Sequence, residues 1–324
     1  MEDIAISIII PVFNIESYIK DCLSSVINQD IRNIEIICIN DCSTDNSLKI
    51  LNEMKKIDDR IIILNHDKNK GLSEARNTGT LKSKGEYLLF LDGDDFLVND
   101  SLKQVLKDIE DLKLDIIRYN FMYFYNDKNV YVENKRYKIK SSKLLTGMEL
   151  FGQLYDNDDY KPMAWLSIYR REFINENKIY FLNGILHEDV EFTPRVLVKA
   201  KKTKLSNTNL VVYRIRENSI TTTVNPKKNK DLLYIVKELK DMVDEEVLEQ
   251  KVKGKLYSLI ASNLLFIINN MSYEDISYYN REIKYSKIEY TLFLSREWKK
   301  IIRYLIIKAF SIKGYWIINK KLKT

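Results

Sequence analysis

Three carboxylates within four positions, Asp92, Asp94 and Asp95, are the side chains of this chain best suited to chemistry. They directly follow the apolar run 87–91, and Gly93 lets the backbone turn tightly between them. Like charges so close together repel one another unless a cation compensates them. Hard divalent cations prefer oxygen ligands and share their coordination shell with substrate phosphates. The pattern predicts a site for a divalent cation and a phosphorylated substrate; the competing interpretation is an exposed acidic turn.

Further polar side chains follow other apolar runs. Pro11, Phe13 and Asn14 come after the first run, and Asp41 comes after the second. A carboxylate there can accept from a base N–H, and a turn that opens a helix presents free backbone donors to a ligand. These residues could equally be ordinary turn and N-cap residues. Arg76, near the start of a later helix, could meet a phosphate or be a solvated surface arginine.

Two more pairs of charged residues stand later in the chain. Glu188 and Asp189 come just ahead of an amphipathic segment, where acidic residues also suit a helix N-terminus. Arg214 and Arg216 share one face of an expected strand. Taken alone, neither pair predicts a function.

The elements that must position these residues alternate over the first 120 positions between short apolar runs and amphipathic helical stretches. This rhythm predicts an α/β fold with a mostly parallel sheet, whose strands are continuously apolar because helices cover both faces. Ligands of such sheets bind outside the carboxyl ends of the strands, which is where the candidates above lie. The expected strands are Ile4–Ile10, Ile34–Ile39, Ile61–Leu64, Tyr87–Leu91 and Asp115–Arg118.

Beyond residue 120 the pattern changes. Residues 121–145 predict an irregular excursion or a β-hairpin, and Thr146 with Glu149 forms a capping-box signature ahead of a helix. Another amphipathic helix is expected at His187–Ala200, and after Pro226 the composition becomes helical. The expected C-terminal helices are Lys230–Asp244, Glu246–Asn269 and Ser295–Ile307.

The net charge of +6 is distributed unevenly, because the last 42 residues carry 11 basic and 2 acidic side chains. The preceding part is close to neutral and has no aromatic-basic motif, so a nucleic-acid partner is not expected. Apolar residues of the tail, such as Trp298 and Phe310, mix with lysines and suit the surface of an anionic membrane. The competing interpretation is an ordinary helix packed on the domain or on another subunit.

Three cysteines without a CxxC pair and only two histidines argue against a disulfide framework and against a zinc site. A reducing, cytoplasmic compartment is the simplest expectation. The N-terminal segment lacks the basic region of a signal peptide, and the longest apolar stretch, 304–318, is interrupted by two lysines. A cytoplasmic protein, peripheral on the inner face of the plasma membrane, is therefore expected.

Together, the motifs resemble glycosyltransferase family 2, inverting enzymes with the GT-A fold, over residues 4–221. The resemblance implies a nucleotide-sugar-binding half at 1–120 and an acceptor-binding half at 121–224, followed by a helical, basic region at 225–324. It implies transfer from a UDP-sugar to a glycan or lipid-linked oligosaccharide in surface polysaccharide synthesis. A homo-oligomer stays open.

For the donor, the resemblance implies specific roles. A bound Mn²⁺ or Mg²⁺ is held by Asp94 with Asp92 nearby at the ribose, and Asp95 orients donor or metal. Arg214 or Arg216 adds positive charge when a loop closes over the diphosphate. The other implied donor contacts are a uridine pocket at Pro11, Phe13 and Asn14, the base at Asp41, and the ribose or diphosphate at Arg76.

For the acceptor, the resemblance implies that Asp189 is the catalytic base, with Glu188 beside it as acceptor binder or partner. Trp165 falls where the family often places an aromatic ring against the sugar. One departure is Cys42, which stands where the family commonly has glycine and puts the geometry of that loop in doubt.

Two alternatives remain. The first is a non-catalytic member that binds a nucleotide sugar or a glycan, against which the intact acidic motifs argue. The second is a sugar-phosphate nucleotidyltransferase, which ranks last because no glycine-rich phosphate loop follows the first strand.

Overall fold

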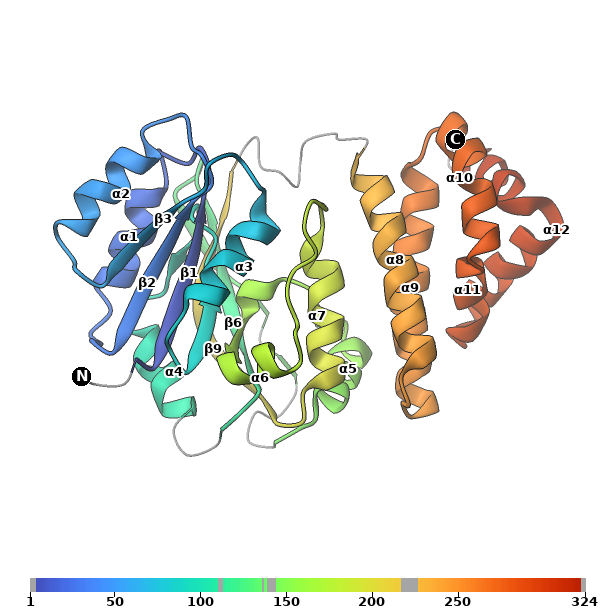
Figure 1. Cartoon of the computed structure of the whole chain (residues 1–324). Coiled ribbons are helices and arrows are strands. Elements are labelled where there is room, and N and C mark those ends of the chain that lie inside the picture. Colours follow the sequence, from blue (N-terminus) through green and yellow to red (C-terminus); the bar gives the residue numbers. More distant parts are fainter. Residues whose placement is uncertain (1–3, 110–112, 136, 139–143, 217–226, 322–324) are drawn as a thin grey trace. The chain divides into compact units, whose positions relative to one another are not determined.

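The structure is a computed structural model that describes residues 4–109, 113–135, 137–138, 144–216 and 227–321. The chain separates into two compact units, one up to residue 223 and one from residue 224. The first unit is an α/β domain, whereas the second consists of helices (Figure 1). The expected α/β class and the C-terminal helical region are confirmed.

The N-terminal unit is built on a mixed sheet, nine-stranded in its described residues, with the order β3-β2-β1-β4-β8-β6-β9-β5 and β7 beside β6. Strands β3, β2, β1 and β4 form a parallel block, while β8 runs antiparallel to both β4 and β6. The strands are β1 (Ile6–Val12), β2 (Ile34–Asn40), β3 (Ile61–Asn65), β4 (Tyr87–Phe90), β5 (Phe96–Leu97), β6 (Ile116–Tyr125), β7 (Val130–Glu133), β8 (Ser167–Arg170) and β9 (Thr203–Ile215).

The expected strands agree with β1 to β4 within two residues at each end, but β6 is much longer than expected. After Arg118 its side chains are aromatic and polar instead of aliphatic, so the continuous apolar signal stops while the strand goes on. Antiparallel pairing of β6 with β7 confirms the hairpin for the described residues of that region.

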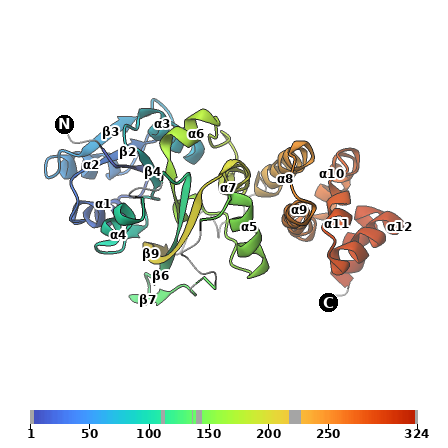
Figure 2. The same ribbon diagram turned by 90° about the horizontal axis from the view of Figure 1, so that it is seen from below.

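Alternate residues of β1 face two different helical layers, as strand geometry requires. Ile6, Ile8 and Ile10 share a core with α1, α2 and α4. Ile9 faces α3, where a Cβ atom added to Gly79 would lie 2.4 Å from the Ile9 Cγ2 atom. Figure 2 shows α1 and α4 on one side of the sheet and α3 and α6 on the other. The helices are α1 (Ile19–Ile27), α2 (Ser47–Lys55), α3 (Leu72–Lys82), α4 (Ser101–Ile109), α5 (Gly147–Asp156), α6 (Arg171–Glu176) and α7 (Glu188–Lys199).

Two helix starts confirm sequence signals. The hydroxyl of Thr146 accepts from the Glu149 backbone N–H at the start of α5, and the Glu149 carboxylate accepts from the Thr146 N–H, which completes the expected capping box. Helix α7 begins directly after His187, close to the expected start, and therefore places Glu188 and Asp189 in its first turn.

The C-terminal unit packs helix α9 between α8 on one side and α11 and α12 on the other (Figures 1 and 2). Helix α10, which begins with a Ser272 capping box, was not expected from the sequence. Helix α12 runs well past the expected end at Ile307 and is kinked at Ser311. The α-helices of the C-terminal unit are α8 (Lys227–Glu245), α9 (Gln250–Asn270), α10 (Tyr273–Tyr285), α11 (Thr291–Leu294) and α12 (Trp298–Lys321). None of the helices in the described parts of the chain is both long and apolar enough to cross a bilayer.

Candidate active site

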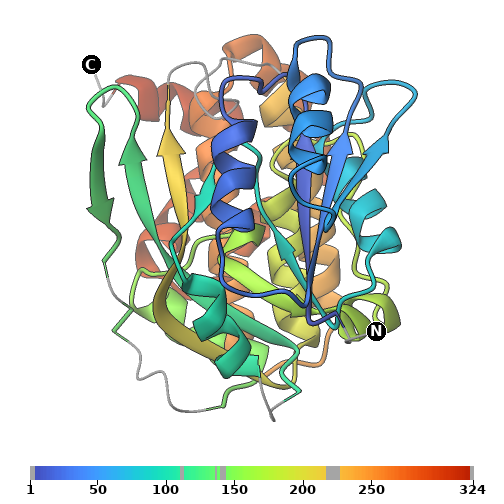
Figure 3. The same cartoon turned by 90° about the vertical axis from the view of Figure 1, so that its left-hand side faces the viewer.

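Most of the expected site residues gather at one rim of the N-terminal sheet, to which the blue strands of Figure 3 all point. The loops after β1 and β2 are joined there, because the Thr44 N–H donates to Asn14 Oδ1 (2.8 Å) and the Asn14 N–H donates to Ser43 Oγ (3.2 Å). Phe13 leaves 46% of its surface exposed beside this junction, and Pro11 is the last residue but one of β1. The rim thus has an exposed aromatic ring and polar loop atoms that a planar ligand can contact.

The acidic turn after β4 lies against the β1 loop. A Cβ atom on Gly93 would lie 2.4 Å from Ile15 Cδ1 and 3.0 Å from the Pro11 carbonyl oxygen, so a larger residue would fit here only if the Ile15 side chain moved and the backbone shifted slightly. Asp92 and Asp94 keep part of their side-chain surface exposed, whereas Asp95 is buried. The carboxylates of Asp92 and Asp94 therefore face the rim, and the carboxylate of Asp95 lies in the interior of the domain.

Arg76 is the centre of the site and is only 1% exposed. Its Nη2 donates to Asp92 Oδ1 (2.7 Å), and its Nη1 donates to Glu188 Oε1 (2.7 Å) and Asp189 Oδ1 (3.0 Å). One guanidinium thus joins the acidic turn after β4 to the first turn of α7, whose Glu188 lies 112 residues after Arg76 in the chain. In this structure the charge of Arg76 is directed at three carboxylates, and its expected place near the ribose or diphosphate of a donor stays a prediction.

The electrostatics of this cluster are dominated by burial. Burial raises the pKa of Asp189 to about 7; Arg76 opposes this rise, and the charges of Glu188 and Asp92 add to it. Burial also disfavours a charged guanidinium, but the three carboxylates outweigh it and raise the pKa of Arg76 above its ordinary value. A carboxylate with a pKa near neutrality can take up a proton at physiological pH, which suits a general base.

Asp94 is paired with an arginine from the other side of the turn. Nε and Nη2 of Arg216 donate to Asp94 Oδ2 at 2.9 and 2.7 Å. Burial and the neighbouring Asp92 charge nevertheless raise the pKa of Asp94 above its usual range. Arg216 is thus bound to a carboxylate of the acidic turn, and its expected contact with the diphosphate stays a prediction.

Arg214 and Asp95 form the interior part of the same contact. The Arg214 N–H donates to Asp95 Oδ1 (2.8 Å), and its Nε donates to the Asp94 carbonyl (2.9 Å). Burial, with the charges of Asp94 and Asp92, raises the pKa of Asp95 well above its ordinary value. Both residues are buried, and their hydrogen bonds hold β9 against the acidic turn. Their expected roles toward donor or metal stay a prediction.

Asp41 is also occupied. Its Oδ1 contacts His66 Nδ1 (2.6 Å) and accepts from the Lys70 N–H (2.8 Å), while Oδ2 accepts from the Gly71 N–H (2.8 Å). The carboxylate thus orders the loop that leads into α3, where the sequence analysis expected it to accept from a base. His66 was not singled out, because an isolated histidine after a strand has no motif that signals it.

Trp165 contradicts its expected role. The ring is 2% exposed and stacks on Tyr213, with centroids 5.6 Å apart, while its edge meets Phe121 at 5.2 Å. A ring enclosed in this way is a core residue and presents no face to an acceptor sugar. The aromatic character of the segment was read correctly, but its burial depends on β6 and β9, whose course the sequence did not reveal.

Tyr18, like His66, is a residue near the site that was not singled out from the sequence. The Cζ atoms of Arg214 and Arg216 lie 5.2 and 4.8 Å from the centroid of its ring, within the range of cation–π attraction. The ring supports both arginines next to the acidic turn. No local signal predicts this contact, since the arginines are almost two hundred residues away in the chain.

A divalent cation would need carboxylates at the rim as ligands. Within the described ranges, no group of three or more His, Cys, Asp or Glu side chains is arranged to hold a metal ion by itself. A cation shared with a diphosphate requires only one or two carboxylates, and Asp92 and Asp94 are both partly exposed at the rim. Their mutual repulsion, visible in the raised pKa of Asp94, is what a cation would relieve. The donor set fits Mn²⁺ or Mg²⁺.

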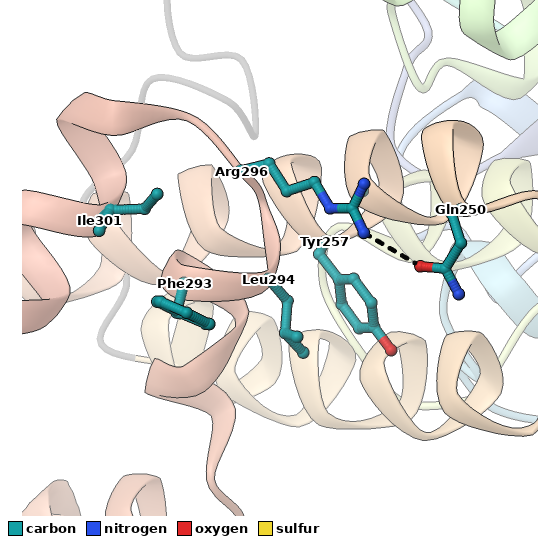
Figure 4. Close-up of a pocket in the computed structure, with 7 residues that line it drawn as sticks. Gln250, Tyr257, Phe293, Leu294, Arg296 and Ile301 are labelled. Atoms are coloured by element: carbon teal, nitrogen blue, oxygen red, sulfur yellow. Dashed lines mark hydrogen bonds between the residues drawn. The ribbon is translucent and has the colours of Figure 1, made fainter.

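Neither of two hollows in the structure coincides with this cluster. One, of about 810 Å³, lies beside Ile4 and Ala5, at the opposite end of β1. The other, of about 310 Å³, lies within the C-terminal unit, where Arg296 donates to Gln250 Oε1 across 3.4 Å (Figure 4). It is lined by Gln250, Gly254, Tyr257, Phe293, Leu294, Arg296 and Ile301. The candidate active site is therefore the open rim and not one of these two hollows. In the C-terminal unit, Arg296 connects the residues just before α12 to the start of α9.

Comparison with known proteins gives the same fold and motifs. The profile of Glycosyl transferase family 2 matches residues 7–177. Glycosyltransferase GlyA of Streptococcus pneumoniae is 32% identical over 68% of this chain and 32% of its own length. Poly(ribitol-phosphate) beta-glucosyltransferase of Bacillus spizizenii is 29% identical over 78% of this chain and 39% of its own length. The chain thus spans between about a third and two fifths of the length of these two relatives.

Among solved structures, residues 1–349 of Staphylococcus aureus TarS in complex with UDP-GlcNAc superpose with a TM-score of 0.80. That match is 20% identical in sequence and covers 98% of this chain and 91% of the TarS chain. Because the match covers 98% of this chain, it includes residues of both units.

Proposed function

Because the chain belongs to glycosyl transferase family 2, we propose that it is an inverting glycosyltransferase that moves a sugar from a nucleotide sugar to a hydroxyl of an acceptor. The observation that carries the proposal is the Arg76 cluster, in which one guanidinium holds Asp92 together with Glu188 and Asp189. The side chain of Arg76 thus separates the carboxylate on the donor side, Asp92, from the two on the acceptor side. Residues 1–120 supply the donor-side carboxylate, and residues 121–224 supply the acceptor-side carboxylates.

Asp189 is the proposed base. The acceptor oxygen forms a bond to the anomeric carbon, the bond from that carbon to the nucleoside diphosphate breaks, and the hydroxyl proton passes to the Asp189 carboxylate. A pKa of about 7 makes this carboxylate able to accept the proton and release it again at neutral pH. A single displacement inverts the anomeric centre, so no covalent nucleophile is needed. Glu188 orients the acceptor or Asp189.

Asp94, with Asp92, is the proposed metal-binding pair. When bound there, Mn²⁺ or Mg²⁺ supplies positive charge that neutralises the diphosphate leaving group. Arg216 already lies on Asp94 and would release it to contact the diphosphate, to which a guanidinium can donate two hydrogen bonds. Pro11, Phe13 and Asn14 are proposed to line the base pocket beside them.

UDP-sugars are the preferred donor class, since the TarS structure of the same fold was solved with UDP-GlcNAc. The acceptor is proposed to be a glycan or lipid-linked oligosaccharide of a bacterial surface polymer. One relative is named for acting on poly(ribitol phosphate), so polyol-phosphate chains belong in the same test.

The test is release of the nucleoside diphosphate from a panel of UDP-, GDP- and dTDP-sugars with Mn²⁺ or Mg²⁺, followed by transfer to each acceptor class. We expect turnover of one UDP-sugar, lost on adding a chelator and lost in Asp94→Ala. The exposed Asp59→Asn substitution removes a carboxylate elsewhere on the same unit and should leave turnover unchanged. Full activity of Asp94→Ala would contradict the metal assignment.

The same panel separates the alternatives. A non-catalytic binder would show saturable binding of a nucleotide sugar but no diphosphate release with any acceptor. Pyrophosphate-dependent exchange would instead indicate a nucleotidyltransferase, against which the family assignment argues. Either result would overturn the proposed transfer.

A further inference from the structure

Helix α12 exposes the apolar side chains that a folded unit ordinarily buries. Trp298, Ile302 and Leu305 are 67%, 47% and 57% exposed, and Ala309 is exposed as well. These positions follow the spacing i, i+4, i+7 and i+11, which places them on one face of the helix. The outward face of the first part of α12 is therefore apolar, and these four residues are called the stripe of α12.

The opposite face of the same helix buries a lysine. Lys300 is 7% exposed, and its Nζ donates to the Ser258 carbonyl (3.0 Å) and to the Ser258 hydroxyl, and pairs with Glu297 (3.0 Å). Ile307, seven positions later, is also buried. Since positions seven apart share a helix face, these two contacts fix which side of α12 faces the unit and hence which side carries the stripe.

In this orientation α12 leaves a tryptophan, an isoleucine and a leucine largely exposed to water, while its inner face buries a lysine whose charge needs hydrogen-bond partners. The acceptors around Lys300 and the burial of Ile307 hold the helix in this orientation. Apolar surface held outward in this way points to a partner that covers it.

The charges beside the stripe identify the partner's chemistry. Helix α12 carries seven basic residues and no acidic one. Lys299 lies over the ring of Trp298 (5.6 Å to the centroid), and Lys308 lies over the ring of Tyr304 (5.8 Å). Their side chains thus run along the aromatic rings with the ammonium groups at the border of the apolar surface, as side chains at a membrane interface do.

We propose that the stripe of α12 inserts at the surface of a bilayer containing anionic lipids, with its basic residues at the headgroups. A second copy of this chain is a poorer occupant, because pairing two α12 helices across the stripe would oppose two strongly positive surfaces. Anionic phospholipid supplies both an apolar layer for the tryptophan and negative charge for the lysines. The inference does not depend on the proposed transfer reaction.

The experiment is co-flotation of the full chain with vesicles of phosphatidylcholine alone or mixed with phosphatidylglycerol. We expect binding to the mixed vesicles only, falling as salt is raised. The triple substitution Trp298→Ser, Ile302→Ser and Leu305→Ser should reduce binding by tenfold or more, on the order expected for removing three apolar side chains from the interface. The matched control replaces three exposed apolar residues of other segments, Val247→Ser, Tyr278→Ser and Tyr285→Ser, and should bind like the unaltered chain.

A charge arm tests the lysines. Lys299→Glu with Lys308→Glu should weaken binding by at least about fivefold for each residue. Lys230→Glu with Lys251→Glu changes two exposed lysines of α8 and α9 by the same charge and should have a smaller effect. If both double variants lost vesicle binding equally, the effect would come from overall charge, and the assignment of membrane binding to α12 would be overturned.

Two other outcomes would overturn the proposal. One is equal binding of the triple variant and the unaltered chain. The other is a dimer in sedimentation that the triple variant abolishes, which would make a second copy the occupant. Circular dichroism melting of every variant checks that the fold is kept.

Discussion

The two units of this protein depart from the usual separation of charge and apolar surface in opposite ways. The N-terminal unit buries the guanidinium of Arg76 among three carboxylates, with 1% of its surface exposed. The C-terminal unit leaves 67% of Trp298 exposed while it buries Lys300. Both arrangements cost stability that an ordinary packing would keep.

The difference teaches what each unit is organised to meet. Buried charges held by other charges are preorganised for a reaction, because their field acts in surroundings of low dielectric constant. Apolar surface held outward is preorganised for contact with another apolar phase. In both units a long cationic side chain secures the costly arrangement, Arg76 in one and Lys300 in the other.

The largest expected effect is on transfer. Asp189→Asn keeps the shape of the side chain but cannot accept the hydroxyl proton, so kcat should fall by about 10²- to 10⁴-fold. Folding should persist, since a buried charge is removed and Arg76 keeps two other carboxylates. Steady-state kinetics and thermal unfolding measure the two effects, with Asp59→Asn as the control. Activity close to that of the unaltered enzyme would remove Asp189 from the mechanism.

The next effect is on stability. Arg76→Gln leaves three carboxylates without their shared cation, and breaking such a buried pair costs about 3–5 kcal/mol. The loss should be seen as a lower free energy of unfolding in urea at pH 8. The exposed Arg32→Gln change should cost less than about 0.5 kcal/mol. Similar values for the two variants would show that Arg76 does not hold the cluster together.

The pH dependence is smaller but has a defined sign. Because the pKa of Asp189 is about 7 and the base must be ionised, kcat/KM should fall about tenfold per unit as pH drops below 7. The folded pKa lies above the ordinary value of 3.8, so the stability that this group contributes is present at low pH and lost as pH rises through about 7.

As the pH rises from 5 to 8, the free energy of unfolding of the Asp189→Asn variant should therefore decrease less than that of the unaltered chain. Denaturant unfolding across that range measures the slope. Identical slopes would mean that Asp189 is not the group with the raised pKa.

The smallest effect sharpens the contrast from the other unit. Each serine substitution in the α12 stripe should change the free energy of unfolding by no more than about 0.5 kcal/mol, because the side chains are exposed. Ile307→Ala, on the buried face of the same helix, should cost about 2–5 kcal/mol. A large loss from the stripe substitutions would mean that α12 packs with the opposite face inward.

Much of the N-terminal fold was predictable because its signals are local. The continuous apolar runs of β1 to β4 and the intervening amphipathic helices define a parallel sheet, and the capping box at Thr146 marks a helix start. The extension of β6 past Arg118 and the helix α10 were not predicted, because aromatic and polar residues are mixed in both segments without the regular spacing of apolar residues that marks a strand or a helix.

The carboxylates at the rim were predictable from the sequence, but their partners were not. Asp92, Asp94 and Asp189 follow from motif and position, whereas the pairing of Arg216 with Asp94 and the stacking of Trp165 on Tyr213 connect distant segments. Which acceptor a long side chain reaches depends on how strands from both halves are ordered in the sheet.

By itself, then, the sequence determined the α/β class, the rim at which polar residues follow the strands, and the basic, apolar character of the tail. Only the tertiary structure decided that Arg76 joins three carboxylates, that Asp41 orders a loop, and that α12 turns its tryptophan outward. The physical reason is the range of the interactions. Periodicity and capping act within a few residues along the chain, while ion pairs and burial depend on atoms brought together from its distant parts.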